Sequence, residues 1–265
     1  MPVIDAHSHI YPDKIACKAS SAVGDFYGVD MNAKNASAAS MLAACEGSPI
    51  THHLVHSVAT TPGQVPIIND FIAEQCREHE NFIGFATMHQ DFEDMEGEID
   101  RAIQLGLKGV KIHPDTQKVN MDDPRLMRLY EIIEGRLPIV IHTGDYRYDY
   151  SHPRRLKKVL HAFPNLVVDA AHFGCWSRYE VGYDILHNAD NLFVDASSSQ
   201  FFLGQRRTVE LARMWGTDRI MFGSDYPMWS PAAEYDQFVT AGFSEDELEN
   251  MLWHNAERFA GVKVG

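Results

Sequence analysis

The chain has 265 residues, of which 45% are hydrophobic and 23% charged, as in a globular protein with a sizeable core and not in a disordered one. Its 23 basic and 37 acidic side chains give a formal net charge of −14, which excludes nucleic acid and anionic membranes as expected partners. The four cysteines form no C-x-x-C pair, the start lacks a signal-peptide pattern, and no run of about 18 apolar residues occurs. We therefore expect a cytoplasmic protein.

Short runs rich in Val, Ile and Phe alternate along the chain with longer segments of helical periodicity. This alternation is typical of a parallel sheet with crossover helices, and the count of eight predicts a (β/α)8 TIM barrel of the α/β class. We expect residues 1–265 to form one domain. The predicted strands are 3–7, 53–59, 82–87, 107–113, 138–142, 166–171, 192–196 and 219–224.

Three segments between the strands carry further local signals. Residues 12–48 are longer than a typical βα unit and predict an inserted loop or short helices over the barrel mouth. Asp123-Pro124 predicts a helix start, and Ser244 with Glu247 predicts a capping box that opens the last helix. A doubly wound open sheet is the rival fold, but the chain contains neither a G-x-G-x-x-G nor a G-x-x-x-x-G-K-[ST] motif.

Polar residues recur where the predicted strands end. The pair His7-Ser-His9 alone means little, because a chain with 14 histidines contains about 0.7 such pairs by chance. Its position after the first strand matters more, since a period of two places both imidazoles on one side of an extended backbone. The carboxyl ends of all barrel strands meet at one face. The other strand-end residues expected at that face are His113, His142, His172 and Asp225.

Imidazole nitrogens and a carboxylate oxygen are usual ligands of a divalent metal ion. We therefore predict a metal site formed by His7, His9, His142 and Asp225, with His172 as a catalytic residue or an additional ligand.

Lys111 lies two residues before His113, so the two side chains are expected to project from the same face of the strand. Three interpretations stay open for it: a carbamylated bridge between metals, a cationic substrate contact, or a lysine paired with an acidic neighbour inside the barrel. The last two are favoured, because a buried lysine needs a charge partner.

These segments also resemble the amidohydrolase superfamily, and within it amidohydrolase family 2, which includes aminocarboxymuconate-semialdehyde decarboxylase-like proteins. Ile-Asp-Ala-His7-Ser-His9 is similar to that family's first strand, and Gly-Ser-Asp225-Tyr-Pro to its eighth. The segments around Lys111, His142 and His172 are similar to its fourth, fifth and sixth strands. The resemblance covers nearly the whole chain and implies a barrel with one divalent metal ion, zinc first, with manganese or another ion as alternatives.

Two reactions fit the same predicted site. In the hydrolase hypothesis, metal-activated water attacks a cyclic ester, an amide or a similar small carbonyl compound, with Asp225 as the base and His172 as its helper. In the alternative, the enzyme is a lyase that removes carbon dioxide from a small unsaturated or aromatic carboxylic acid. A non-catalytic barrel scaffold is the third hypothesis.

Substrate contacts are expected from the loops that follow the strands. Arg147 could hold a carboxylate bidentately, and Lys111, Ser197 and Trp229 are further candidates. The expected partner is a small-molecule substrate, which in the decarboxylase hypothesis is a carboxylate. A homodimer is also compatible with the sequence.

Overall fold

The computed structural model describes residues 2–264, in which eight parallel strand segments close into a barrel. The segment predicted at 82–87 is divided at Phe85, whose amide still donates to the Val55 carbonyl at 2.9 Å. The first and last strands close the ring, because the Ala6 amide donates to the Phe222 carbonyl at 2.9 Å and Ser8 bridges Tyr226 in parallel. The predicted (β/α)8 barrel is confirmed.

Each predicted strand overlaps an observed one, and most of the observed strands are shorter, although β1 ends two residues later and β2 begins one residue earlier than predicted. The strands are β1 (Ile4–His9), β2 (His52–His56), β3 (Phe82–Gly84), β4 (Ala86–Thr87), β5 (Val110–Ile112), β6 (Ile139–Ile141), β7 (Val168–Ala170), β8 (Leu192–Asp195) and β9 (Ile220–Met221).

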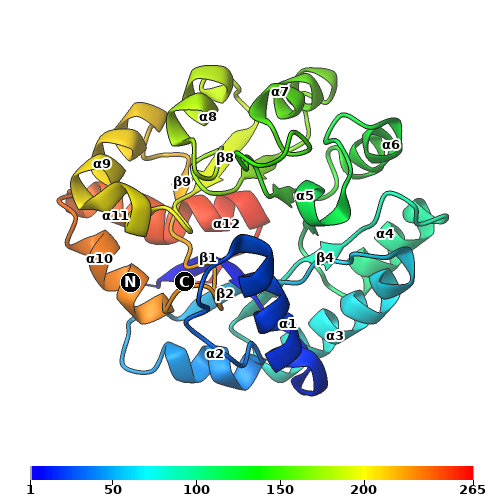
Figure 1. Ribbon diagram of the computed structural model, residues 1–265, viewed down its shortest axis with the longest axis horizontal. Coiled ribbons are helices and arrows are strands. Elements are labelled where there is room, and N and C mark those ends of the chain that lie inside the picture. The colour runs from blue at the N-terminus through cyan, green and yellow to red at the C-terminus, as the bar shows by residue number, and fades with distance from the viewer. Residues whose placement is uncertain (1, 265) are drawn as a thin grey trace.

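Helices surround the strands in a ring, with α1 lying in front of them in the view of Figure 1. The helical elements are α1 (Asp13–Tyr27), α2 (Ala38–Ala44), η1 (Pro62–Gln64), α3 (Val65–Glu78), α4 (Met95–Gln104), α5 (Pro114–Gln117), α6 (Pro124–Ile133), α7 (Pro153–Ala162), α8 (Tyr179–Leu186), α9 (Gln200–Trp215), α10 (Pro231–Val239), α11 (Glu245–Glu249), η2 (Asn250–His254) and α12 (Asn255–Ala260).

The local helix signals are confirmed by the caps. The Asp123 side chain accepts a hydrogen bond from the Arg125 amide at the start of α6. Ser244 and Glu247 form both hydrogen bonds of a capping box at the start of α11. The segment 12–48 holds α1 and α2, so its main element is a helix of 15 residues and not a loop.

Apolar packing closes the end of the barrel opposite to the polar residues. Phe259 of α12 stacks on Phe85, with ring centroids 5.8 Å apart, and both belong to a buried cluster that includes Ile4 and Val140. The barrel therefore offers access to its interior from the other end, where the strands finish. Within residues 2–264, no helix combines the length and apolar character needed to cross a membrane.

Candidate metal centre and its pocket

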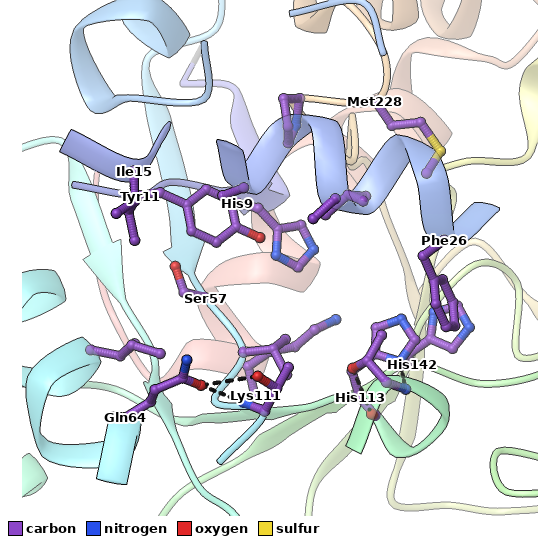
Figure 2. A pocket seen from close by; sticks show the side chains of 18 of the residues that line it. His9, Tyr11, Ile15, Phe26, Ser57, Gln64, Lys111, His113, His142 and Met228 are labelled. Carbon is purple, nitrogen blue, oxygen red and sulfur yellow. Dashed lines mark hydrogen bonds between the residues drawn. The ribbon is translucent and has the colours of Figure 1, made fainter. Parts of the chain in front are cut away.

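A cavity of about 690 Å³ opens at the carboxyl ends of the strands. Figure 2 shows His9, Lys111, His113 and His142 facing this cavity from different strand ends. Residues that are more than 200 positions apart in the chain meet here because the barrel closes. The strand-end residues that line the cavity are His7, His9, Lys111, His113, His142, His172 and Asp225.

Asp225 lies close to two of the other three predicted ligands. Oδ1 of Asp225 lies 3.5 Å from Nε2 of His9 and 3.7 Å from Nε2 of His7. Both distances exceed an ordinary hydrogen bond, which is about 2.7–3.2 Å. They are close to the separation of about 3.3–3.4 Å between two ligands of a tetrahedral ion bound at about 2.0–2.1 Å. The two separations from Asp225 therefore suit a bound divalent ion, and His7 and His9 also form, with His56, a group whose ligand atoms all lie within 4.8 Å of one another.

Asp195 fixes the orientation of His7. Nδ1 of His7 donates to Oδ2 of Asp195 at 2.7 Å, and neither side chain is exposed to solvent. Although burial alone would raise the pKa of the Asp195 carboxyl, the His7 ring beside it holds that pKa well below its usual range. The pair keeps the proton of His7 on Nδ1, so Nε2 is left as an electron-pair donor. This is the arrangement by which carboxylates support metal-binding histidines.

Lys111 is fully buried and reaches the same nitrogen. Its Nζ donates to Nε2 of His7 at 3.1 Å. Burial lowers the pKa of this ammonium group to about 8, against the attraction of Asp195 and Asp225. Among the described residues no carboxylate forms an ion pair with Lys111, so the expected acidic partner acts only at longer range.

His142 and His172 form a second pair on the cavity wall. Nε2 of His172 and Nδ1 of His142 share a hydrogen bond of 3.0 Å, and Nε2 of His142 donates to the Gly144 carbonyl at 3.1 Å. Both nitrogens of His142 thus have protein partners. The structure brings His142 into the cavity but not into the cluster of His7, His9 and Asp225.

His142 instead neighbours His113 and Asp115. Its ring stacks on His113 with centroids 3.9 Å apart, and its Nε2 lies 3.6 Å from Oδ2 of Asp115. His113 in turn shares a hydrogen bond of 2.7 Å with the Tyr27 hydroxyl of α1. The ligand atoms of His113, Asp115 and His142 all lie within 4.8 Å of one another, close enough to hold a cation.

Burial favours the neutral form of three of the imidazoles that line the cavity. It lowers the pKa of His172 to about 4, and it lowers the pKa values of His9 and His142 well below the usual histidine range. Because only a neutral imidazole nitrogen can bind a cation, this environment suits metal binding.

The other expected substrate contacts do not reach the cavity. The Arg147 guanidinium is held by Asp145 at 2.7 Å and by the Phe26 carbonyl, and stacks on aromatic rings. Ser197 lies behind His172, with its Oγ 2.8 Å from Nδ1. Nε1 of Trp229 donates to Ser198 Oγ at 2.8 Å. Of the candidates named from the sequence, Lys111 alone lines the cavity among residues 2–264, because the other three side chains are engaged elsewhere.

Two residues near the site were not identified from the sequence. Asp195 ends β8, two positions before Ser197, and this strand-end position was an available signal. His56 is fully buried, with its ring centroid 4.4 Å from that of His9 and 4.8 Å from that of His7. Neither of its ring nitrogens has a hydrogen-bond partner among the described residues.

Comparison with protein families gives one match that spans nearly the whole chain. A family model described as amidohydrolase matches residues 4–262. No curated protein matches the chain.

Solved structures share the fold at low sequence identity. An uncharacterized TIM-barrel protein from Bordetella bronchiseptica is 19% identical with a TM-score of 0.80, and the match covers 98% of this chain and 99% of that one. A dihydroxybenzoic acid decarboxylase from Polaromonas, with bound manganese and an inhibitor, is 16% identical with a TM-score of 0.73, covering 98% and 97%. A putative 2-pyrone-4,6-dicarboxylic acid hydrolase from Pseudomonas putida is 16% identical with a TM-score of 0.72, covering 99% and 98%.

Proposed function

The chain belongs to the amidohydrolase family of metal-dependent enzymes, and from this premise we propose that it hydrolyses a small carbonyl compound, such as a cyclic ester or an amide. One observation carries the proposal: Asp225 faces Nε2 of both His7 and His9 at 3.5–3.7 Å, at the floor of an open cavity. A carboxylate in this position serves both as a ligand and as a base.

We assign the metal to His7, His9 and Asp225, with His142 as the fourth predicted ligand after rotation of its side chain. When bound, a divalent ion supplies Lewis-acid chemistry, since it polarises a carbonyl oxygen and lowers the pKa of water. Zinc is the first choice because two imidazoles and a carboxylate are usual zinc ligands. Manganese is the alternative, and the Polaromonas decarboxylase contains it.

The protein's own residues would then handle the proton. Oδ1 of Asp225 accepts it from water and passes it to the leaving group, while Oδ2 stays fixed by a hydrogen bond from Ser198 Oγ. Ser198 is held in turn by Trp229 Nε1 at 2.8 Å. His172 lines the cavity with its Nδ1 beside Ser197, and we assign it to orienting the water or the developing oxyanion.

Decarboxylation is the second candidate, and Lys111 favours it. This buried ammonium group lines the cavity, where it could hold the carboxylate of a small unsaturated or aromatic acid. The bond from the carboxylate to its neighbouring carbon breaks, carbon dioxide leaves, and that carbon takes a proton from Asp225 or His172. Several of the solved structures that share the fold are decarboxylases and one is a putative 2-pyrone-4,6-dicarboxylic acid hydrolase. At 16–18% identity they establish the fold alone, so the choice of reaction rests on the residues of this chain.

The decisive experiment combines metal analysis with two substrate panels. We expect the purified protein to contain about one divalent ion per chain and to lose thermal stability on chelation. Lactones and amides are then tested for hydrolysis, and small carboxylic acids for release of carbon dioxide. Hydrolysis supports the first candidate and gas release the second. A protein that lacks metal and is unchanged by chelation would be a scaffold. The cytoplasmic location and a homodimer remain predictions.

A further inference from the structure

The cavity extends well beyond the polar residues at its floor. Its outer walls come mainly from one face of α1 and from the start of α3, and their side chains are apolar. Figure 2 shows Ile15 and Phe26 of α1 on opposite sides of this space, with His9 between them. The apolar residues that define the two walls are Ile15, Ala19, Val23, Phe26, Ile67 and Phe71.

Two large aliphatic side chains stand at the rim of this cavity. Ile67 of α3 is 66% exposed and Ile15 of α1 is 48% exposed, although both line the same space. Single exposed aliphatic residues are common on proteins and need no explanation. Here the two exposed residues continue an apolar lining that begins at the catalytic floor. The lining lysines Lys18 and Lys118 are exposed, so their charges remain in water.

The volume is also large for a small carbonyl group. A cavity of about 690 Å³ lies within the range of about 300–1,000 Å³ that encloses drug-sized ligands. The polar floor occupies one end, at His7, His9 and Asp225, and apolar walls make up most of the rest, with the neutral polar side chains of Ser57, Thr60, Gln64 and Thr116 among them. A ligand that matches this distribution is polar at one end and apolar along its length.

We propose that the substrate carries an apolar substituent, an alkyl or aryl group, that lies between α1 and α3 and points outward past Ile15 and Ile67. This inference rests on the proposed function only for the position of the reacting group at the floor. The substrate class is then a hydrophobic carbonyl or carboxyl compound and not a small, fully polar metabolite.

The physical driving force is removal of apolar surface from water on both partners. Burial of one methylene group contributes enough to strengthen binding by about fourfold. Affinity should therefore rise with chain length while the substituent runs along the walls. The rise should stop once the substituent passes Ile15 and Ile67 and reaches solvent.

The test measures binding and not turnover, so that it stands apart from the proposed reaction. The probes are 4-alkylbenzoates and neutral 4-alkylacetophenones, each from methyl to hexyl, titrated calorimetrically into the metal-loaded protein. We expect affinity to increase by up to about fourfold per methylene in at least one series. No increase with chain length in either series would overturn the proposal, even if the enzyme hydrolyses a small ester.

A matched pair of variants locates the effect. I67E places a charge at the rim, and we expect it to remove most of the chain-length dependence. I103E changes an isoleucine of α4 that is 39% exposed and does not line the cavity, so the dependence should persist. Equal slopes in I67E and I103E would also overturn the proposal. Absence of hydrolysis and of decarboxylation, with the chain-length dependence intact, would instead count against the proposed function.

Discussion

Oδ2 of Asp195 accepts a hydrogen bond of 2.7 Å from Nδ1 of His7, and both residues are completely buried beneath the cavity. The carboxylate fixes the tautomer of the imidazole, so Nε2 faces Asp225 without a proton. A residue that does not reach the cavity thereby controls a proposed metal ligand.

We predict that D195N weakens metal binding by about 10–100-fold, because the amide no longer fixes His7 in the binding tautomer. Competition with a chromogenic chelator measures the affinity. D190N is the matched control, since Asp190 is exposed in the turn before β8. Equal affinities in the two variants would count against a role for Asp195 in supporting the metal site.

The D225N substitution should reduce kcat by about 10²–10⁴-fold at saturating metal, because an amide cannot accept the proton from water. S198A should give a smaller loss, since it leaves the Asp225 carboxylate in place and removes the hydrogen bond to its Oδ2 together with the acceptor of Trp229 Nε1. Steady-state kinetics on whichever substrate panel is turned over, with metal content measured in parallel, separate the two effects. Full activity in metal-loaded D225N would exclude Asp225 as the base.

Removal of the Lys111 charge should strengthen metal binding. Its Nζ competes for Nε2 of His7 at 3.1 Å and repels a cation at the same place. We expect about tenfold tighter binding in K111M, which keeps a long apolar side chain in the buried position. Equilibrium titration with zinc and manganese tests this expectation. K108M, in the exposed turn before β5, should match the unaltered protein. A weaker site in K111M would mean that Lys111 supports the metal.

Stability should depend on pH through Glu234 of α10, which lies away from the cavity. Burial raises the pKa of this carboxyl from 4.5 to about 7. Between these two values the folded chain keeps a proton that the unfolded chain has released, so stability falls as the pH rises. The full effect above pH 7 is on the order of 3–4 kcal/mol.

The E234Q substitution should remove this part of the pH dependence, because a neutral amide replaces the titrating group. Urea unfolding at pH 5 and pH 8 measures the change in the free energy of unfolding between these two pH values. E46Q, at an exposed position, is the control. If the free energy of unfolding changes by the same amount between pH 5 and pH 8 in E234Q and E46Q, Glu234 does not titrate between these pH values.

The sequence determined the barrel and the face on which the site lies. Most of the β-strands are short apolar runs, and this local pattern does not depend on distant residues. Parallel strands with short connections place all strand ends on one face, so the sequence predicts that His7, His9, His142 and Asp225 lie at the same face. The caps at Asp123 and Ser244 are equally local, since each involves residues within three positions.

Only the tertiary structure decided which of those side chains touch one another. Arg147 was expected to bind substrate, but Asp145 and the Phe26 carbonyl take its donors. His142 enters the cavity with both nitrogens engaged, and Asp195 supports His7 across 188 positions of the chain. The hydrophobic periodicity of the sequence indicates which strand a residue belongs to and from which face of that strand its side chain projects. The rotamer and the hydrogen-bond partner depend on neighbours brought together by barrel closure, and no local pattern records them.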